Sequence, residues 1–163
     1  MCRSLGRRAP RRKTDATLAA PSLRAQAIRL LARREYARAE LEERLLAKGG
    51  ARDVVRALLD ELEGQGYLSN GRYARAIASQ NAGRYSRRSI AAQLKAKGVG
   101  SDDIAAALAD ASPDDGVALE ALWRRRFGTA PADDREKARQ VRFLHARGFA
   151  LSAILKLLRQ VAQ

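Results

Sequence analysis

Basic side chains gather at two places in the chain where their spacing would let them bind phosphate groups. The first cluster lies on and just before a helix expected over 86–96, and it consists of Arg84, Arg87, Arg88 and Lys95. Arg88 and Lys95 are seven residues apart and share one helix face, whereas Ile90 and Leu94 point roughly the opposite way. Only small residues intervene on or near the basic face, so a polyanion would have room to approach closely.

The second cluster follows Trp123, and together with the next expected helix it contains Arg124, Arg125, Arg126, Lys137 and Arg142. The planar guanidinium group suits phosphate and carboxylate better than the point charge of lysine does. A solvated helix face would explain any single arginine here. The excess of basic over acidic residues favours a binding surface instead, because residues 71–101 contain no acidic residue between the cations.

Catalytic and metal-binding chemistry is not indicated by the residues present. His145 is the only histidine, and no second ligand type clusters near it at metal spacing. The sequence contains no Walker-type phosphate loop, and its acidic pairs fall at expected helix starts or loops, where capping and dipole effects explain them. We therefore expect no enzyme, no metal and no cofactor.

Composition and charge limit which fold class and which kinds of partner the chain can have. The 163 residues carry a net charge of +14, which favours a polyanionic partner. Hydrophobic residues make up 46% and aromatic residues 5%, so the core must use aliphatic helix formers, and we expect an all-α fold. No stretch approaches the ~20 apolar residues of a spanning helix. A lone cysteine, Cys2, suits a reducing cytoplasm.

A glycine-anchored pattern repeats three times along the chain. Lys48-Gly49, Lys97-Gly98 and Arg147-Gly148 lie 49 and 50 residues apart. Matching apolar residues stand four before, six after and ten after each glycine: Leu45, Leu94 and Leu144; Val55, Ile104 and Ile154; Leu59, Leu108 and Leu158. A repeat of this kind predicts stacked units that bury surface against one another.

Each unit is expected to contain three helices, with a glycine turn between the second and the third. We assign residues 1–22 to a mobile basic arm and the three-helix repeats to 23–69, 70–111 and 112–163. We expect Ser101 to cap the third helix of the second unit, and Leu151, Ile154, Leu155, Leu158 and Val161 to line the core side of the last helix. The whole should form an elongated, curved helical array.

Several motifs in this frame resemble the RecX family of bacterial regulatory proteins, over about residues 23 to 162. The motifs are Arg33-Arg34-Glu35-Tyr36, Glu40-Leu41, Leu45 with Lys48-Gly49, Gly66-Tyr67-Leu68, Arg72-Tyr73-Ala74, Leu94 with Lys97-Gly98, and Arg142-Phe143-Leu144 with Arg147-Gly148-Phe149. The resemblance implies tandem three-helix repeats and binding to the RecA recombinase filament, with inhibition of its ATPase, strand-exchange and coprotease activities. It thereby implies roles in recombination and in the SOS response.

Three positions depart from the pattern of that family. Ala37 stands where the family often has a capping serine, and Ser69-Asn70 replaces a common pair of aspartates. A Gly-Pro pair is absent before Ile90. These departures are expected to weaken local caps.

Three hypotheses about function stay open at this point, one of them a pure protein-interaction scaffold that would bind the recombinase without DNA. The leading one is a cytoplasmic, monomeric filament modulator that contacts both the recombinase and single- or double-stranded DNA, with no membrane partner. The alternative is a general basic helical DNA-binding protein without filament specificity, for which charge alone would suffice.

Overall fold

The computed structural model describes residues 22–111 and 113–162, and within these ranges it contains nine helices and no strand. The helices are α1 Leu23–Leu31, α2 Arg38–Ala47, α3 Arg52–Gly64, α4 Asn70–Asn81, α5 Arg87–Ala96, α6 Ser101–Ala111, α7 Asp115–Arg126, α8 Asp134–His145 and α9 Leu151–Val161. The arm expected over 1–22 lies outside the described residues except for Ser22. The Ser22 hydroxyl accepts the Ala25 N–H at 3.2 Å and caps α1.

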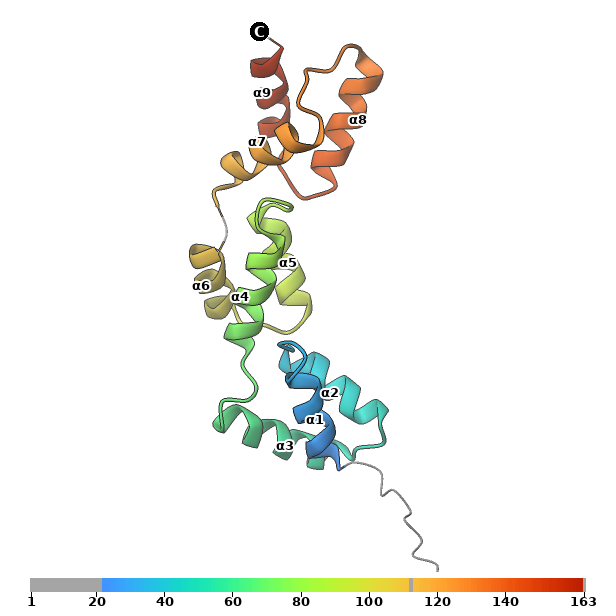
Figure 1. Ribbon diagram of the computed structural model, residues 1–163, viewed down its shortest axis with the longest axis vertical. Helices are drawn as coiled ribbons and strands as arrows, with labels where there is room; N and C mark the ends of the chain where they lie inside the picture. The colour runs from blue at the N-terminus through green and yellow to red at the C-terminus, as the bar shows by residue number, and fades with distance from the viewer. Residues whose placement is uncertain (1–21, 112, 163) are drawn as a thin grey trace, which may run out of the picture.

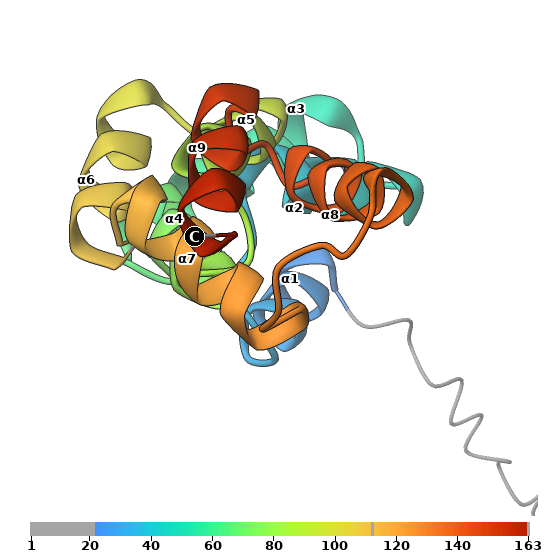
Figure 2. The same cartoon turned by 90° about the horizontal axis from the view of Figure 1, so that it is seen from above.

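Three units of three helices are stacked along the longest axis of the molecule (Figure 1). Viewed along that axis, the units overlie one another (Figure 2). Each unit has its own apolar core, and all nine of the repeating Leu, Val and Ile positions are buried in these cores. The structure confirms an all-α fold of three tandem three-helix units in an elongated array.

The glycine of each repeat ends the second helix of its unit in the left-handed backbone region. Gly49, Gly98 and Gly148 have φ angles of +88°, +75° and +87°. After α2 and α5 the chain turns back so that the amides of Gly50 and Val99 each donate to a leucine carbonyl, at 3.2 Å in both cases. This arrangement satisfies carbonyls that the helix end would otherwise leave unpaired.

Successive units meet through the same contacts at both junctions. The glycine turn of one unit lies against the start of the second helix of the unit before it: Gly98 is beside Ala39, and Gly148 is beside Ser86 and Ser89. The Ser86 N–H also donates to the Arg147 carbonyl at 3.0 Å. The repeated glycines therefore serve two purposes, since they end a helix and also allow the next unit to approach closely.

Each junction also supplies a helix cap from the following unit. The Arg38 N–H at the start of α2 donates to the Asn70 side chain at 2.9 Å, and the Arg87 N–H at the start of α5 donates to Asp115 at 2.7 Å. Ala37 makes no side-chain cap of its own. Asn70 therefore caps the start of α2 from the next unit. Ser69 caps α4 by accepting the Arg72 N–H at 3.2 Å, so the expected weakening of local caps is wrong at Ser69 and Asn70.

Two local expectations from the sequence are wrong. Ser101 is the first residue of α6 rather than the residue before it, and the Ile104 N–H donates to the Gly100 carbonyl. On α9, Leu157 is buried, whereas Leu151 at the start of the helix is 48% exposed. The apolar stripe of α9 is thus centred further along the helix than simple periodicity indicated, because α9 packs on α7 as well as on α8.

The core of the third unit contains a buried glutamine where the other two units have aliphatic residues. Gln140 stands four residues before Leu144 and matches Leu41 and Ile90 in the first two units. Its side-chain oxygen accepts the indole N–H of buried Trp123 at 2.8 Å, and its amide nitrogen donates to the Thr129 carbonyl at 3.4 Å. Gln140 thereby satisfies the polar groups of this core.

Gln140→Leu is expected to lower the free energy of unfolding by about 1–3 kcal/mol, because it leaves the buried Trp123 N–H without an acceptor. Urea unfolding followed by far-ultraviolet circular dichroism would measure this loss, and the same signal can follow a variant that lacks Trp123, the single tryptophan of the chain. The double variant Trp123→Phe with Gln140→Leu removes both partners and should recover part of the stability. A Gln140→Leu variant as stable as the parent would contradict this account of the pair.

Glu40 forms an ionic cluster beside the first junction. Partial burial is the largest single influence and would raise the pKa of its carboxyl group. The hydrogen bond from Arg34 and the charges of Arg34, Lys97 and Arg44 together outweigh burial and hold that pKa below its ordinary value. Lys97 belongs to the second unit, so the cluster spans the junction.

A carboxyl group with a lowered pKa in the folded state makes stability depend on pH at the acid end. Glu40 should contribute its full stabilisation above the ordinary carboxyl pKa and lose it as the pH falls through the lowered value. Urea unfolding at a series of pH values below the ordinary carboxyl pKa should therefore show a shallower acid decline for Glu40→Gln than for the parent. Identical slopes for the two proteins would show that the Glu40 carboxyl titrates alike in the folded and unfolded states.

Candidate nucleic-acid interface

Ion pairs are distributed unevenly among the described residues. Six of them join two side chains of the first unit and two lie in the third unit, but none joins two side chains of the second unit. The exposed cations on and around α5 are therefore not neutralised by acids of their own unit. Such cations keep more of their field for an external anion.

The structure brings the two predicted basic clusters together at the second junction. The Arg125 side chain, at the end of α7, donates to the Gly83 carbonyl at 3.2 Å, although the two residues are 42 positions apart. Gly83 precedes Arg84 in the α4–α5 loop, and both arginines are exposed. Arg87 begins α5 and is half-buried, with its N–H held by Asp115 of α7. We call Arg84, Arg87, Arg125 and Arg126 the basic junction.

Arg126 is held over a pair of aromatic rings. The rings of Phe127 and Phe143 meet edge to face with centroids 5.3 Å apart, and the Arg126 guanidinium carbon lies 5.9 Å and 5.6 Å from those two centroids. Arg147 also stacks on this pair, 3.5 Å from the Phe143 centroid. Cation–π contacts of this kind fix the direction of an arginine and leave its N–H groups able to bind phosphate.

Some residues in and around the second predicted cluster lie outside the basic junction, namely Arg124, Lys137 and Trp123. Arg124 forms an ion pair with Glu120 at 2.6 Å, which lowers the charge it presents. Lys137 lines a separate hollow between α8 and α9, beside Leu158. Trp123 is 5% exposed and bonded within the core, so it is not available to stack on a base.

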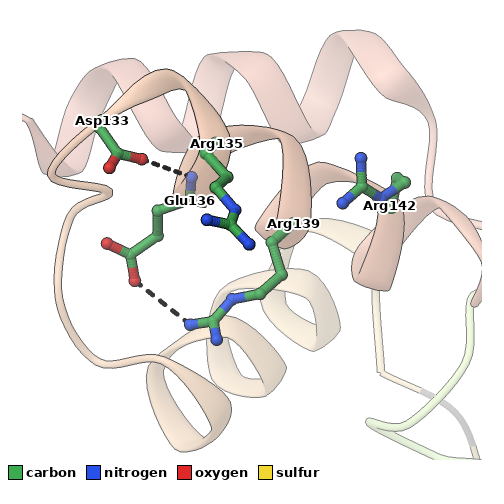
Figure 3. A pocket seen from close by; sticks show the side chains of 5 residues that line it. All are labelled: Asp133, Arg135, Glu136, Arg139 and Arg142. Carbon is green, nitrogen blue, oxygen red and sulfur yellow. Dashed lines mark hydrogen bonds and ion pairs between the residues drawn. The ribbon is translucent and has the colours of Figure 1, made fainter.

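A third group of cations lies along α8, and it includes Arg142 of the predicted binding residues. Arg135, Arg139 and Arg142 are spaced as i, i+4 and i+7, and they line a hollow of about 420 Å³ (Figure 3). Arg139 pairs with Glu136 at 3.3 Å, so this carboxylate reduces the charge of the group. Arg135 was not predicted as a binding residue, although its spacing to Arg142 was visible in the sequence.

The start of α8 is capped by its own acidic side chains. The Asp133 side chain accepts the Glu136 N–H at 2.7 Å (Figure 3). The Glu136 carboxylate reaches back to the N–H of Ala132 at 3.2 Å, rather than to that of Asp133. Both acids are therefore used by the helix start.

Arg88 lies in the first turn of α5 and Lys95 in its last turn. Both are exposed, while Ile90 and Leu94 are buried, as the helix faces predicted. Lys95 borders a hollow that Ala91 also lines. The nine residues predicted to bind DNA or a filament therefore fall into separate groups, and four of them form the basic junction.

The described residues also give two negative findings. No group of three or more His, Cys, Asp or Glu side chains in residues 22–111 and 113–162 is placed to hold a metal ion. Over the same part of the chain, none of the helices has both the length and the apolar character needed to cross a membrane. His145 is engaged locally, with its Nδ1 atom 3.2 Å from the Phe149 carbonyl oxygen.

Comparison with known proteins assigns all three units to one family. Family models described as the first, second and third three-helix domains of RecX match residues 24–62, 69–108 and 114–158. A protein of Ralstonia pickettii named Regulatory protein RecX is 39% identical over 137 residues, which cover 84% of this chain and 86% of that protein. The protein of the same name from Chromobacterium violaceum is 42% identical over 137 residues, covering 84% and 89%.

Solved structures show the same fold at lower sequence identity. The crystal structure of RecX from Lactobacillus salivarius superposes with a TM-score of 0.63 at 17% identity, covering 86% of this chain and 94% of that one. The family models, the relatives and the repeated three-helix architecture agree over most of the chain. The chain therefore belongs to the RecX family of regulatory proteins.

Proposed function

We propose that this chain binds the RecA recombinase–DNA filament and inhibits its ATPase, strand-exchange and coprotease activities. In this way it would modulate recombination and the SOS response. The relatives named regulatory proteins support a regulatory role. The observation that carries the proposal is the basic junction, where Arg125 bonds to the Gly83 carbonyl next to Arg84 of another unit. Neither arginine has an acidic partner among the described residues.

An elongated array suits a target that is itself extended and repetitive. The stacked units present cations at the second junction and again along α8, so one molecule would contact phosphates at separate points of a filament (Figure 1). Lodged along the filament, it would bridge recombinase subunits and the enclosed DNA. Stiffening of the filament would then suppress ATP turnover.

The proposal includes the manner in which the protein works. It acts as a monomer in the cytoplasm, without catalytic activity and without a cofactor. Its repeats are those assigned from the sequence, at 23–69, 70–111 and 112–163, preceded by a basic arm over 1–22. In support of this register, Lys137 of α8 stands at the position that matches Arg38 and Arg87, the first residues of α2 and α5.

The alternative function is general binding to nucleic acid. The net charge of +14 and the unneutralised cations of the second unit favour it. Under this alternative, affinity for any DNA depends on salt. For duplex DNA, log affinity should fall by ~0.9 per phosphate contact for each tenfold rise in salt concentration. Under this alternative, the filament would be bound only as one more polyanion.

The two functions differ in how they respond to competing DNA. RecA ATPase on single-stranded DNA should be inhibited by substoichiometric amounts of the chain, and the inhibition should persist when excess duplex DNA is added. Persistence is expected because a filament-specific protein gains contacts that free DNA lacks. Inhibition that disappears in proportion to added duplex would overturn filament specificity and favour the alternative.

A further inference from the structure

An apolar hollow of about 460 Å³ lies between α5 and α6 of the second unit. Its floor is formed by Val99, Ile104 and Leu108, each less than a tenth exposed. Alanines at 91, 92 and 105 form its walls and leave it open to solvent. A depression of this size accepts aliphatic side chains from another molecule. We call it the α5–α6 groove.

Of the three units, only the second has small residues at the two matching wall positions occupied by Ala91 and Ala105. Ala91 and Ala105 match Glu42 and Arg56 in the first unit, 49 residues earlier, where the two side chains form an ion pair at 3.4 Å across the same two helices. Their matches in the third unit, 50 residues later, are the larger apolar residues Val141 and Leu155. In the first unit an ion pair therefore covers the equivalent place, and in the third unit larger apolar side chains stand at the matching positions.

The rim of the groove is positively charged. Lys95 lines it, and Arg88 lies on the same helix face because it precedes Ala91 by three residues and Lys95 by seven. No acidic side chain lines the groove: Asp103 lies against Gly71 of α4, and Asp102 accepts a hydrogen bond from Ser101 at the edge of the groove. No ion pair in the described residues involves Arg88 or Lys95. An apolar groove bordered by cations that form no ion pair is complementary to an amphipathic helix with an acidic polar face.

We propose that the α5–α6 groove binds an acidic amphipathic helix of a protein partner, and that the recombinase in the filament supplies this helix. The identity of the partner rests on the proposed function. The chain's own residues 1–22 carry six basic residues and one acid, so they would be repelled by the rim. A second copy, at +14, is disfavoured on the same ground, and a DNA strand offers no aliphatic side chains to fill the floor.

The repeat itself supplies a variant that closes the groove without changing the net charge. Ala91→Glu with Ala105→Arg would introduce the ion pair that the first unit already has at the matching positions. A second variant, Ala91→Val with Ala105→Leu, would introduce the residues of the third unit. The matched control is Ala96→Glu with Ala106→Arg, which makes the same exchange at exposed positions of the same helices outside the groove.

Binding is measured to immobilised RecA filaments on single-stranded DNA and, separately, to a fluorescent single-stranded oligonucleotide. Both groove variants should bind the filament about tenfold more weakly or worse, as expected when a central apolar anchor is excluded. Their oligonucleotide affinity and thermal unfolding midpoints should match those of the parent. The control variant should behave like the parent in every assay. Lys95→Gln should weaken filament binding several-fold, because it removes one rim cation.

The remaining outcomes separate failure of this inference from failure of the proposed function. If the parent chain does not bind the filament, the proposed function fails, and the named partner fails with it. If the parent binds and the groove variants bind equally well, only the groove is excluded. If the variants lose oligonucleotide and filament binding together, the groove belongs to a nucleic-acid surface and the protein helix is overturned.

Discussion

Gly148→Ala is expected to weaken the contact between the second and third units more than any other single-methyl change in the chain. A Cβ atom at this position would lie 2.6 Å from the Ser86 hydroxyl oxygen and 2.7 Å from the Ser89 Cβ atom, so the two units would have to move apart. The hydrogen bond from the Ser86 N–H to the Arg147 carbonyl would be strained by the same movement. Displacement here would also disturb the basic junction, which depends on the same pair of units.

Gly49→Ala is the matched control, because it differs from Gly148→Ala mainly in its surroundings. Its φ of +88° is close to the +87° of Gly148, but a Cβ atom at Gly49 would meet nothing within 4 Å. Both variants should lose roughly 1–2 kcal/mol through a left-handed alanine. Gly148→Ala should lose about 1–3 kcal/mol more, the usual effect of overpacking. Urea unfolding of the two variants measures the difference, and equal losses would contradict the close approach at the second junction.

Arg84→Glu with Arg125→Glu is expected to abolish most of the binding to DNA and to the filament. The two side chains are exposed, come from different units and are brought together by the Arg125–Gly83 hydrogen bond. If each arginine binds one phosphate, the slope of log affinity against log salt for single-stranded DNA should become shallower by about 0.7 for each phosphate that the variant no longer binds. Affinity at low salt should fall by more than about tenfold, because the reversed charges also repel the phosphates. Fluorescence anisotropy with a labelled oligonucleotide over a range of salt measures both quantities.

The control for this reversal changes the net charge by the same amount in the first unit. Arg29→Glu with Arg52→Glu alters two exposed arginines that have no ion-pair partner among the described residues. If binding depends on the location of the basic junction, this control should retain most of the affinity and the parent salt slope. Equal weakening by both pairs would show that net charge alone drives binding.

The helices and their cores were predictable from the sequence because their signals are local. A glycine turn, an apolar period and a capping residue each act within one or two turns of helix, so the starts of α4, α7 and α8 follow from residues close to them. Repetition then strengthened each local signal, since Leu45, Leu94 and Leu144 are buried alike. The interpretation of α9 was wrong where packing between helices, as at Leu157, decides which face is buried.

The junctions and the site depended on contacts that no local signal encodes. The cap that Asn70 gives to Arg38 joins residues 32 positions apart, and the Arg125–Gly83 bond joins residues 42 apart. The sequence showed two basic clusters but not that they meet. The alanines at 91 and 92 were interpreted as room for a polyanion, whereas the structure places them on the wall of an apolar groove. Their meaning depends on α6, which supplies the rest of that groove.

Cryo-electron microscopy of RecA filaments on single-stranded DNA with a saturating amount of the chain tests the central claim most directly. The proposed function predicts continuous density for the three stacked units along the filament, with Arg84 and Arg125 facing the DNA phosphates and the α5–α6 groove against recombinase protein. Regular filaments without this density, with the chain found only on uncovered DNA, would contradict it.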